Sequence, residues 1–172
     1  KRFPTEKFKD IETETSSMYL GKIFQAVVYQ PIIKKNDYSF LYKYLHDVPH
    51  LCLLTFYWHM VQVPLNTNQR TPEQVLPFAK VIYNEVMTRP QAGADQVYSE
   101  REWKDYLLTR GKDMILKHAF VLDATGSSAE ALELMEEIKG KYNFKSAEYN
   151  NQYVHLLEKN GYQSMVIPTI VA

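Results

Sequence analysis

Two glycines, Gly126 and Gly161, each follow an apolar helical pattern and lie 35 residues apart in the chain. Superposing the two runs aligns similar residue types, such as Val121 with Leu156 and Asp123 with Glu158. A fixed period of about 20 to 50 residues is typical of stacked structural repeats. We therefore expect antiparallel helix pairs that stack on one another, with a glycine just after the last helical residue.

The 35 residues framed by these glycines predict a helix, a short turn and a second helix. Ser127 and Glu130 have the spacing of a capping box at the start of the first helix, and Ser146 can cap the second. Apolar residues then recur with a period near 3.6. The expected buried stripes are Ala131, Leu134, Met135 and Ile138 in the first helix, and Tyr149, Tyr153, Leu156 and Leu157 in the second.

Similar signals predict helices upstream. We expect one from Ser16 or Ser17 to Pro31, one capped by Asp37, and one opened by Pro49 that contains the sequence HLCLLTFYWHMVQV. Its run from Phe56 to Met60 has too many large side chains for one helix to bury alone, so other helices or a partner should cover it.

Two further capping boxes mark later helices. Thr71 with Gln74 opens TPEQVLPFAKVIYNEVM, where Pro77 lies early enough to be accommodated. The inner face of this helix should hold Val75, Phe78, Ala79, Ile82 and Val86. Ser99 with Glu102 opens a segment that is one long helix or two helices split at Gly111.

These patterns predict an all-α protein, an α-solenoid of seven to nine helices arranged as antiparallel pairs. Strand-like alternation is found only in the tail MVIPTIVA, where Pro168 argues against a strand. The loop from Arg89 to Gln96 separates an irregular helical region, residues 1–94, from the more regular hairpins of residues 95–172. We expect the two regions to form one continuous domain.

Composition limits the function classes. Twenty basic residues balance twenty acidic ones, so the chain lacks the positive excess of most proteins that bind many phosphates. A single cysteine, Cys52, excludes an internal disulfide and a cysteine-based zinc site, and fits a reducing compartment. The longest apolar run, residues 51–58, is too short to span a bilayer, so we expect a soluble protein.

The segment AEALELMEEIKGKYNFKSAEYNNQYVHLLEKNG resembles a pentatricopeptide repeat, and TPEQVLPFAKVIYNEVM is loosely similar to the second helix of such a repeat. Tetratricopeptide and other helical-hairpin repeats share this pattern of small residues and leucines. The resemblance implies a protein without a cofactor that binds single-stranded or ribosomal RNA in an organelle. A mitochondrial ribosome or another ribonucleoprotein is one such setting.

The resemblance also implies an RNA-binding site. Asn151 falls where the family places a base-reading polar residue, whereas Leu116, the matching residue one unit earlier, cannot hydrogen-bond a base edge. Lys139, Lys141 and Lys145 could contact phosphates, and Tyr142 could stack on a base. Glu133, Glu136 and Glu137 lie close by in sequence, so an ordinary solvated helix end is the alternative interpretation.

Three other classes of function are alternatives to RNA binding. A helical scaffold that binds only proteins within a larger complex fits the neutral charge, and the many tyrosines and phenylalanines suit protein interfaces. A metal site at His46, Asp47 and His50, with His59 farther on, is disfavoured because Pro49 interrupts the helical spacing. An enzyme using His46, Asp47 or His50 is disfavoured because no catalytic motif supports it. The chain begins at Lys1, which suggests a removed targeting segment or a fragment, and either a mitochondrial matrix or a cytoplasmic location fits.

Overall fold

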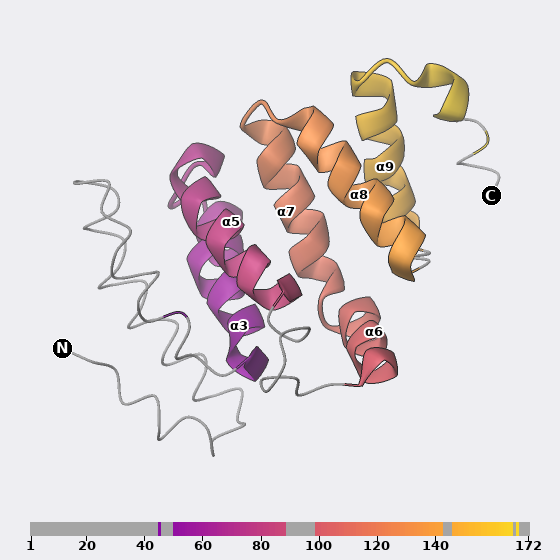
Figure 1. Cartoon of the computed structure of the whole chain (residues 1–172). Coiled ribbons are helices and arrows are strands. Elements are labelled where there is room, and N and C mark those ends of the chain that lie inside the picture. Colours follow the sequence, from indigo (N-terminus) through magenta and orange to yellow (C-terminus); the bar gives the residue numbers. More distant parts are fainter. Residues whose placement is uncertain (1–44, 46–49, 89–98, 143–145, 167, 169–172) are drawn as a thin grey trace. The chain divides into compact units, whose positions relative to one another are not determined.

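The structure is a computed structural model that describes Leu45 and residues 50–88, 99–142, 146–166 and 168 of the chain. These residues form helices and turns and no strand, which confirms the all-α fold class (Figure 1). None of their helices is long and apolar enough to cross a membrane. The helix expected before Pro31 lies outside the described residues, and of the helix expected after Asp37 only Leu45 is described, as a buried helical residue.

The chain divides into two compact units, residues 1–103 and 104–172, and the division falls within α6 (Glu100–Thr109). Each unit is described separately. The boundary between residues 94 and 95 and the solenoid arrangement stay predictions.

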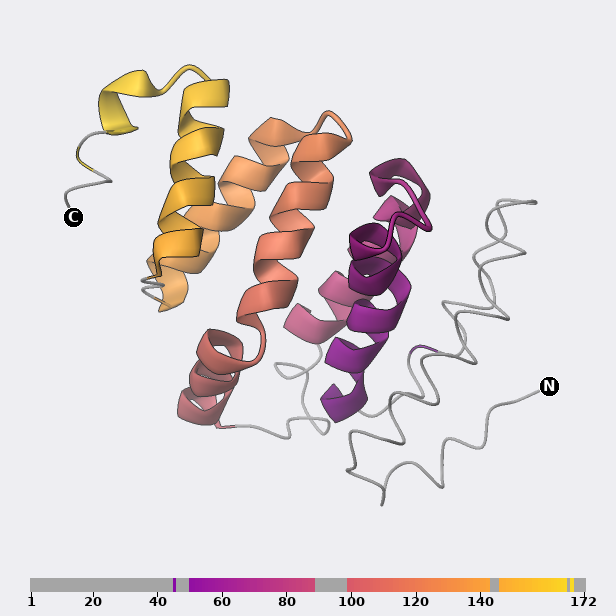
Figure 2. The ribbon, with the colours of Figure 1, turned by 180° about the vertical axis from the view of Figure 1, so that it is seen from behind.

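In the first unit, α3 (His50–Tyr57) and α5 (Pro72–Thr88) are antiparallel neighbours that contact each other (Figure 2). A π-helical turn, η2 (Trp58–Gln62), and the short α4 (Val63–Asn66) follow α3 directly. Because α5 contacts both α3 and η2, it helps to bury most of the aromatic run, including Phe56, Tyr57 and Met60. Trp58 remains 44% exposed.

The π-helical turn lies just before Pro64, which is at the start of α4. Proline has no N–H to donate, and its ring clashes with the carbonyl four residues earlier. A wider turn relieves that clash while the helical path continues, so Pro64 accounts for the π-helical geometry. A turn in which Asn68 takes a positive φ of 56° then leads to α5.

The predictions for α5 are confirmed. The Thr71 backbone N–H donates to Gln74 Oε1 at 3.0 Å, and the Gln74 backbone N–H donates to Thr71 Oγ1 at 3.3 Å. Pro77 lies inside the continuous helix. The buried face comprises Val75, Phe78, Ala79, Ile82 and Val86, as expected.

Residues 99–124 form two helices, α6 and α7 (Lys112–Ala124), so the helical segment is interrupted near Gly111. The capping box at the start of α6 is confirmed, because the Glu102 backbone N–H donates to Ser99 Oγ at 3.2 Å and the reciprocal bond measures 3.4 Å.

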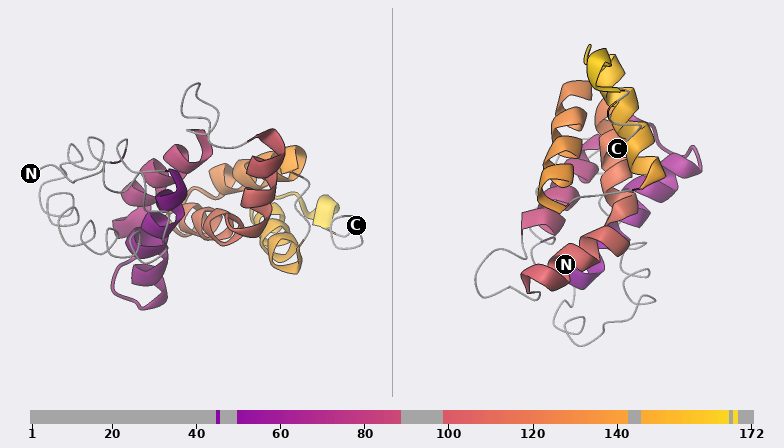
Figure 3. Two further views of the ribbon diagram at one scale, coloured as in Figure 1. Left: turned by 90° about the horizontal axis from the view of Figure 1, so that it is seen from below. Right: turned by 90° about the vertical axis from the view of Figure 1, so that its right-hand side faces the viewer.

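The second unit contains α7, α8 (Ser128–Tyr142) and α9 (Ala147–Lys159), which contact one another pairwise. The helices α7 and α9 run in the same direction and α8 runs back between their ends (Figures 1 and 3). As predicted, Ser146 Oγ caps α9 by accepting from the Tyr149 backbone N–H at 3.1 Å. The buried residues of α9 are Tyr149, Tyr153, Leu156 and Leu157, which confirms the predicted stripe.

The two glycines give α7 and α9 the same ending. Gly126 and Gly161 have positive φ values of 91° and 83°, a conformation that strains residues with a Cβ atom. After α7, the Ser127 N–H donates to the Leu122 carbonyl at 2.8 Å. After α9, the Tyr162 N–H donates to the Leu157 carbonyl at the same distance. Both ends are Schellman motifs, repeated 35 residues apart.

One expectation in this unit differs from the structure. Leu132, not Leu134, joins Ala131, Met135 and Ile138 as a buried residue of α8, while Leu134 is half-buried. Leucines at both positions satisfy a broad helical stripe, so the sequence pattern alone could not choose between them. The described residues of the tail form a 3₁₀ turn, η5 (Gln163–Met165), and further helical residues, in agreement with the prediction that Pro168 disfavours a strand.

The glycine conformations predict opposite effects of two alanine substitutions. Gly161→Ala should lower the free energy of unfolding by about 1 kcal/mol, because alanine is strained at positive φ. Gly140→Ala, inside α8 with open space around the added Cβ, should raise it by about 0.5 to 1 kcal/mol. Urea unfolding followed by circular dichroism measures both, and a shift of the same sign in both variants would contradict this account.

Candidate functional site

Polar contacts join α7 to α9 along the length of both helices. Lys112 Nζ lies 2.5 Å from Glu148 Oε2, Gln152 Nε2 donates to the Leu116 carbonyl at 3.1 Å, and Lys159 Nζ lies 2.6 Å from Asp123 Oδ1. The two residues of each pair are 36 positions apart in the sequence. Each α7 residue therefore contacts the α9 residue that lies one 35-residue repeat and one further position along the chain. We call this row of contacts the α7–α9 seam.

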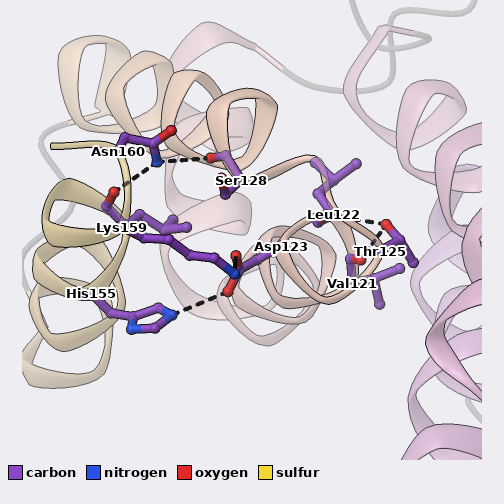
Figure 4. A network of polar contacts seen from close by, with 9 residues as sticks. Val121, Leu122, Asp123, Thr125, Ser128, His155, Lys159 and Asn160 are labelled. Carbon is purple, nitrogen blue, oxygen red and sulfur yellow. Dashed lines mark hydrogen bonds and ion pairs between the residues drawn. The ribbon is translucent and has the colours of Figure 1, made fainter.

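Asp123 is the most enclosed charged group of the α7–α9 seam. Its side chain is only 13% exposed, and its two oxygens receive different partners from α9. His155 Nε2 lies 3.2 Å from Asp123 Oδ2, while Lys159 Nζ forms an ion pair with Asp123 Oδ1 (Figure 4). One carboxylate of α7 therefore holds two successive turns of α9.

The environment lowers the pKa of Asp123 below its ordinary value. Partial burial opposes ionisation and is the largest single influence, but the hydrogen bonds and positive charges of Lys159 and His155 together outweigh it. The carboxylate is therefore ionised throughout the neutral range and available to both partners.

The residues that follow the last turns of α7 and α9 also take equivalent positions. Thr125 Oγ1 donates to the Val121 carbonyl at 2.8 Å, and Asn160 Nδ2 donates to the Leu156 carbonyl at 2.8 Å. The same Asn160 amide also lies 3.3 Å from the Ser128 carbonyl and so ties the end of α9 to the start of α8 (Figure 4). A side chain thus satisfies a carbonyl near both helix ends.

The lysines predicted to contact RNA have partners within the second unit. Lys139 Nζ lies 4.9 Å from the centre of the Tyr153 ring, and Lys141 Nζ lies 2.8 Å from Glu137 Oε1. The hydrogen bond with Glu137 raises the pKa of Lys141. Tyr142 is half-buried at the end of α8, and Lys145 lies outside the described residues.

Asn151 is exposed on α9, and it does not belong to the face that carries Tyr149 and Tyr153. Those tyrosines point toward α8, since the buried Tyr149 hydroxyl donates to the Met135 carbonyl and Lys139 lies over Tyr153. Asn151 is two positions from each tyrosine, on the opposite side of the helix. The structure therefore separates Asn151 from Lys139 instead of gathering them into one site.

The alternative metal site cannot be assembled from the described residues. His46 and Asp47 lie outside them, as do the side chains of His50 and Cys52. His59 is buried within the π-helical turn. No group of three or more potential metal ligands is found in the part of the chain that the structure describes.

The α7–α9 seam was not anticipated from the sequence, although one signal could have indicated it. Charged residues of opposite sign lie 36 positions apart, as in the pairs Lys112 with Glu148 and Asp123 with Lys159. Aligning residues one period apart emphasises similarity, whereas residues in contact must be complementary. A search for complementary pairs near the repeat period would have found it.

Comparisons with protein-family models, curated proteins and solved structures gave no match to this chain. The resemblance to pentatricopeptide repeats therefore stays a prediction, and the function must be argued from the geometry.

The enclosed position of Asp123 predicts a pH-dependent contribution to stability. Asp123→Asn should lower the free energy of unfolding by about 1 kcal/mol at neutral pH, because charge-assisted hydrogen bonds are lost from a partly exposed cluster. Since folding lowers the pKa of Asp123, the contribution is complete above the unfolded pKa near 3.9 and disappears as the pH falls through the folded pKa.

Urea unfolding of both proteins between pH 7 and pH 2.5 measures this difference. Lys141→Met provides the control, because it removes an exposed pair on one helix and should cost only about 0.3 to 0.5 kcal/mol. An Asp123→Asn effect of equal size at both extremes of pH would show that the carboxylate charge is not responsible.

Proposed function

We propose that this chain is a non-enzymatic helical-repeat protein that acts as a scaffold subunit in a multi-subunit complex and binds protein partners. The observation that carries the proposal is that most described lysines of the second unit already have a partner within that unit. Five of its six described lysines lie against an acid or an aromatic ring of the same unit: Lys112, Lys117, Lys139, Lys141 and Lys159. Lys104 is the sixth.

Lysines engaged in this way are poorly suited to phosphate binding. Affinity for single-stranded nucleic acid depends on cations that neutralise phosphates, and each contact made within the protein competes with that role. Residues 104–172 also contain eight basic and nine acidic side chains, so they have no cationic excess. Both properties favour a protein partner over an RNA strand.

Several large apolar side chains are exposed, and they provide a surface that a protein partner could cover. Trp58, Phe120, Tyr162 and Met165 are between 44% and 51% exposed. Aromatic residues and methionine are enriched in protein interfaces, while isolated apolar side chains also occur on ordinary surfaces. Lys117 Nζ lies 5.2 Å from the centre of the Phe120 ring, which is 46% exposed.

RNA contact is the second proposal, and exposed Asn151 is the observation that favours it. Its amide can hydrogen-bond a base edge, as the family resemblance implies. In this alternative the chain is an organellar, mitochondrial RNA-associated factor or a ribonucleoprotein component. Lys139, Lys141, Tyr142 and Lys145 would then add contacts to the strand.

Binding of a fluorescent oligouridylate to the purified full chain separates the two proposals. The scaffold proposal expects no saturable binding at 50 mM salt below about 100 µM protein, because five of the six described lysines of the second unit already lie against an acid or an aromatic ring. A complex recovered with the tagged chain from its native cells should likewise survive nuclease treatment.

Saturable binding that weakens steeply with salt would overturn the scaffold proposal in favour of RNA. Under that outcome Asn151→Ala and Lys139→Ala should weaken binding, while Lys104→Ala, outside the predicted site, serves as the matched control.

A further inference from the structure

The face of α7 that receives α9 has a counterpart on α9 itself. The α7 side of the α7–α9 seam includes Lys112, Leu116 and Asp123. The residues 35 positions later in the sequence lie on α9 and form a second face there. These are Ala147, Asn151 and Glu158, with Val154 between them at the position equivalent to Ala119. We call these four residues the outer α9 face.

The outer α9 face differs from its counterpart in being uncovered. Ala119 of α7 is fully buried, whereas Val154 is half-buried, and Ala147, Asn151 and Glu158 are exposed. Among the described residues no cation pairs with Glu158, although Asp123 at the equivalent position receives two partners. Tyr162 and Met165, which follow α9 directly, are exposed as well.

We propose that the outer α9 face binds a helix of a protein partner, and that a lysine of this helix pairs with Glu158 as Lys159 pairs with Asp123. The inference rests on the proposed scaffold function. The shared helix endings support the equivalence, because Gly126 and Gly161 place Asp123 and Glu158 at the same distance from identical Schellman motifs. Repeats stacked in this manner contact the next unit through equivalent faces.

The α7–α9 seam also specifies the chemistry of the partner helix. Gln152 precedes Lys159 by seven residues and donates to the Leu116 carbonyl. The partner should therefore carry an amide seven positions before its lysine, directed at the Asn151 carbonyl. No basic counterpart of Lys112 is present, since Ala147 takes its place, so the partner needs no acid at the position equivalent to Glu148.

Charge favours a protein helix over RNA at this face. Glu158 would repel a phosphate, whereas a lysine would be attracted to it. Val154 offers apolar area that a helix can cover, and Asn151 can bond to the amide of a helix side chain as readily as to a base. The outer α9 face thus supplies an acid, an amide and apolar area in the order that the α7–α9 seam uses.

A defined helix tests whether the outer α9 face can accept one. A second copy of residues 127–161, inserted between Gly161 and Tyr162 of the full chain, places the copied Lys159 opposite Glu158. Hydrogen exchange should show protected amides in the copied α9 segment. Glu158→Ala should lower that protection about two- to fivefold, which is the effect of one exposed ion pair. The control Glu133→Ala, which changes an exposed acid of α8, should leave the protection unchanged.

An inserted copy without protected amides would overturn the proposal, as would protection that Glu158→Ala leaves unchanged. The natural complex gives the second measurement: Glu158→Lys should abolish assembly and Glu133→Lys should preserve it. Assembly that tolerates Glu158→Lys refutes the outer α9 face alone, whereas failure to find any nuclease-resistant complex refutes the scaffold function. Saturable oligouridylate binding by the unaltered chain that Asn151→Ala abolishes would identify the face as an RNA site.

Discussion

The left-handed conformation of two glycines sets the geometry of the second unit. Gly126 ends α7 and lets the chain reverse into α8, and the same backbone geometry recurs at Gly161. Because the Schellman motif fixes which carbonyls are satisfied, it also fixes where the last turn of each helix lies relative to the reversal. Asp123 lies in the last turn of α7 and Asn160 directly follows the last turn of α9, and each reaches a neighbouring helix. The seam between α7 and α9 thus depends on how the helices end.

Local features of the structure could be predicted because their causes are local. The capping boxes at Thr71 and Ser99 involve residues three apart, and the stripe of α9 follows from helical periodicity alone. The stripe of α8 was predicted less accurately. Leu132 and Leu134 are both apolar, and the relative position of α7 and α9 decides which one is buried.

The polar contacts were harder to predict than the helices. The family resemblance indicates Asn151 and positive charge indicates Lys139 and Lys141, but neither signal shows that α8 and α9 direct these side chains to different places. Formal charge also does not reveal which cations have partners. Lys159 resembles any surface lysine until α7 brings Asp123 against it. Charge complementarity between consecutive 35-residue repeats, and not composition, determines which charged groups remain available to a binding partner.

The spacing of the seam has a consequence for how the second unit folds. The polar contacts between its helices, such as Tyr149 to Met135, Asp123 to His155 and Asp123 to Lys159, span 14, 32 and 36 residues. Each helix meets only the next one or the one after it, so no contact has to wait for a distant part of the chain. Contacts between neighbouring helices lose less loop entropy than pairings of distant chain segments, and such local topology is associated with faster folding. A unit of this kind can gain structure in the order in which it is synthesised, with α7 already in place when α9 arrives.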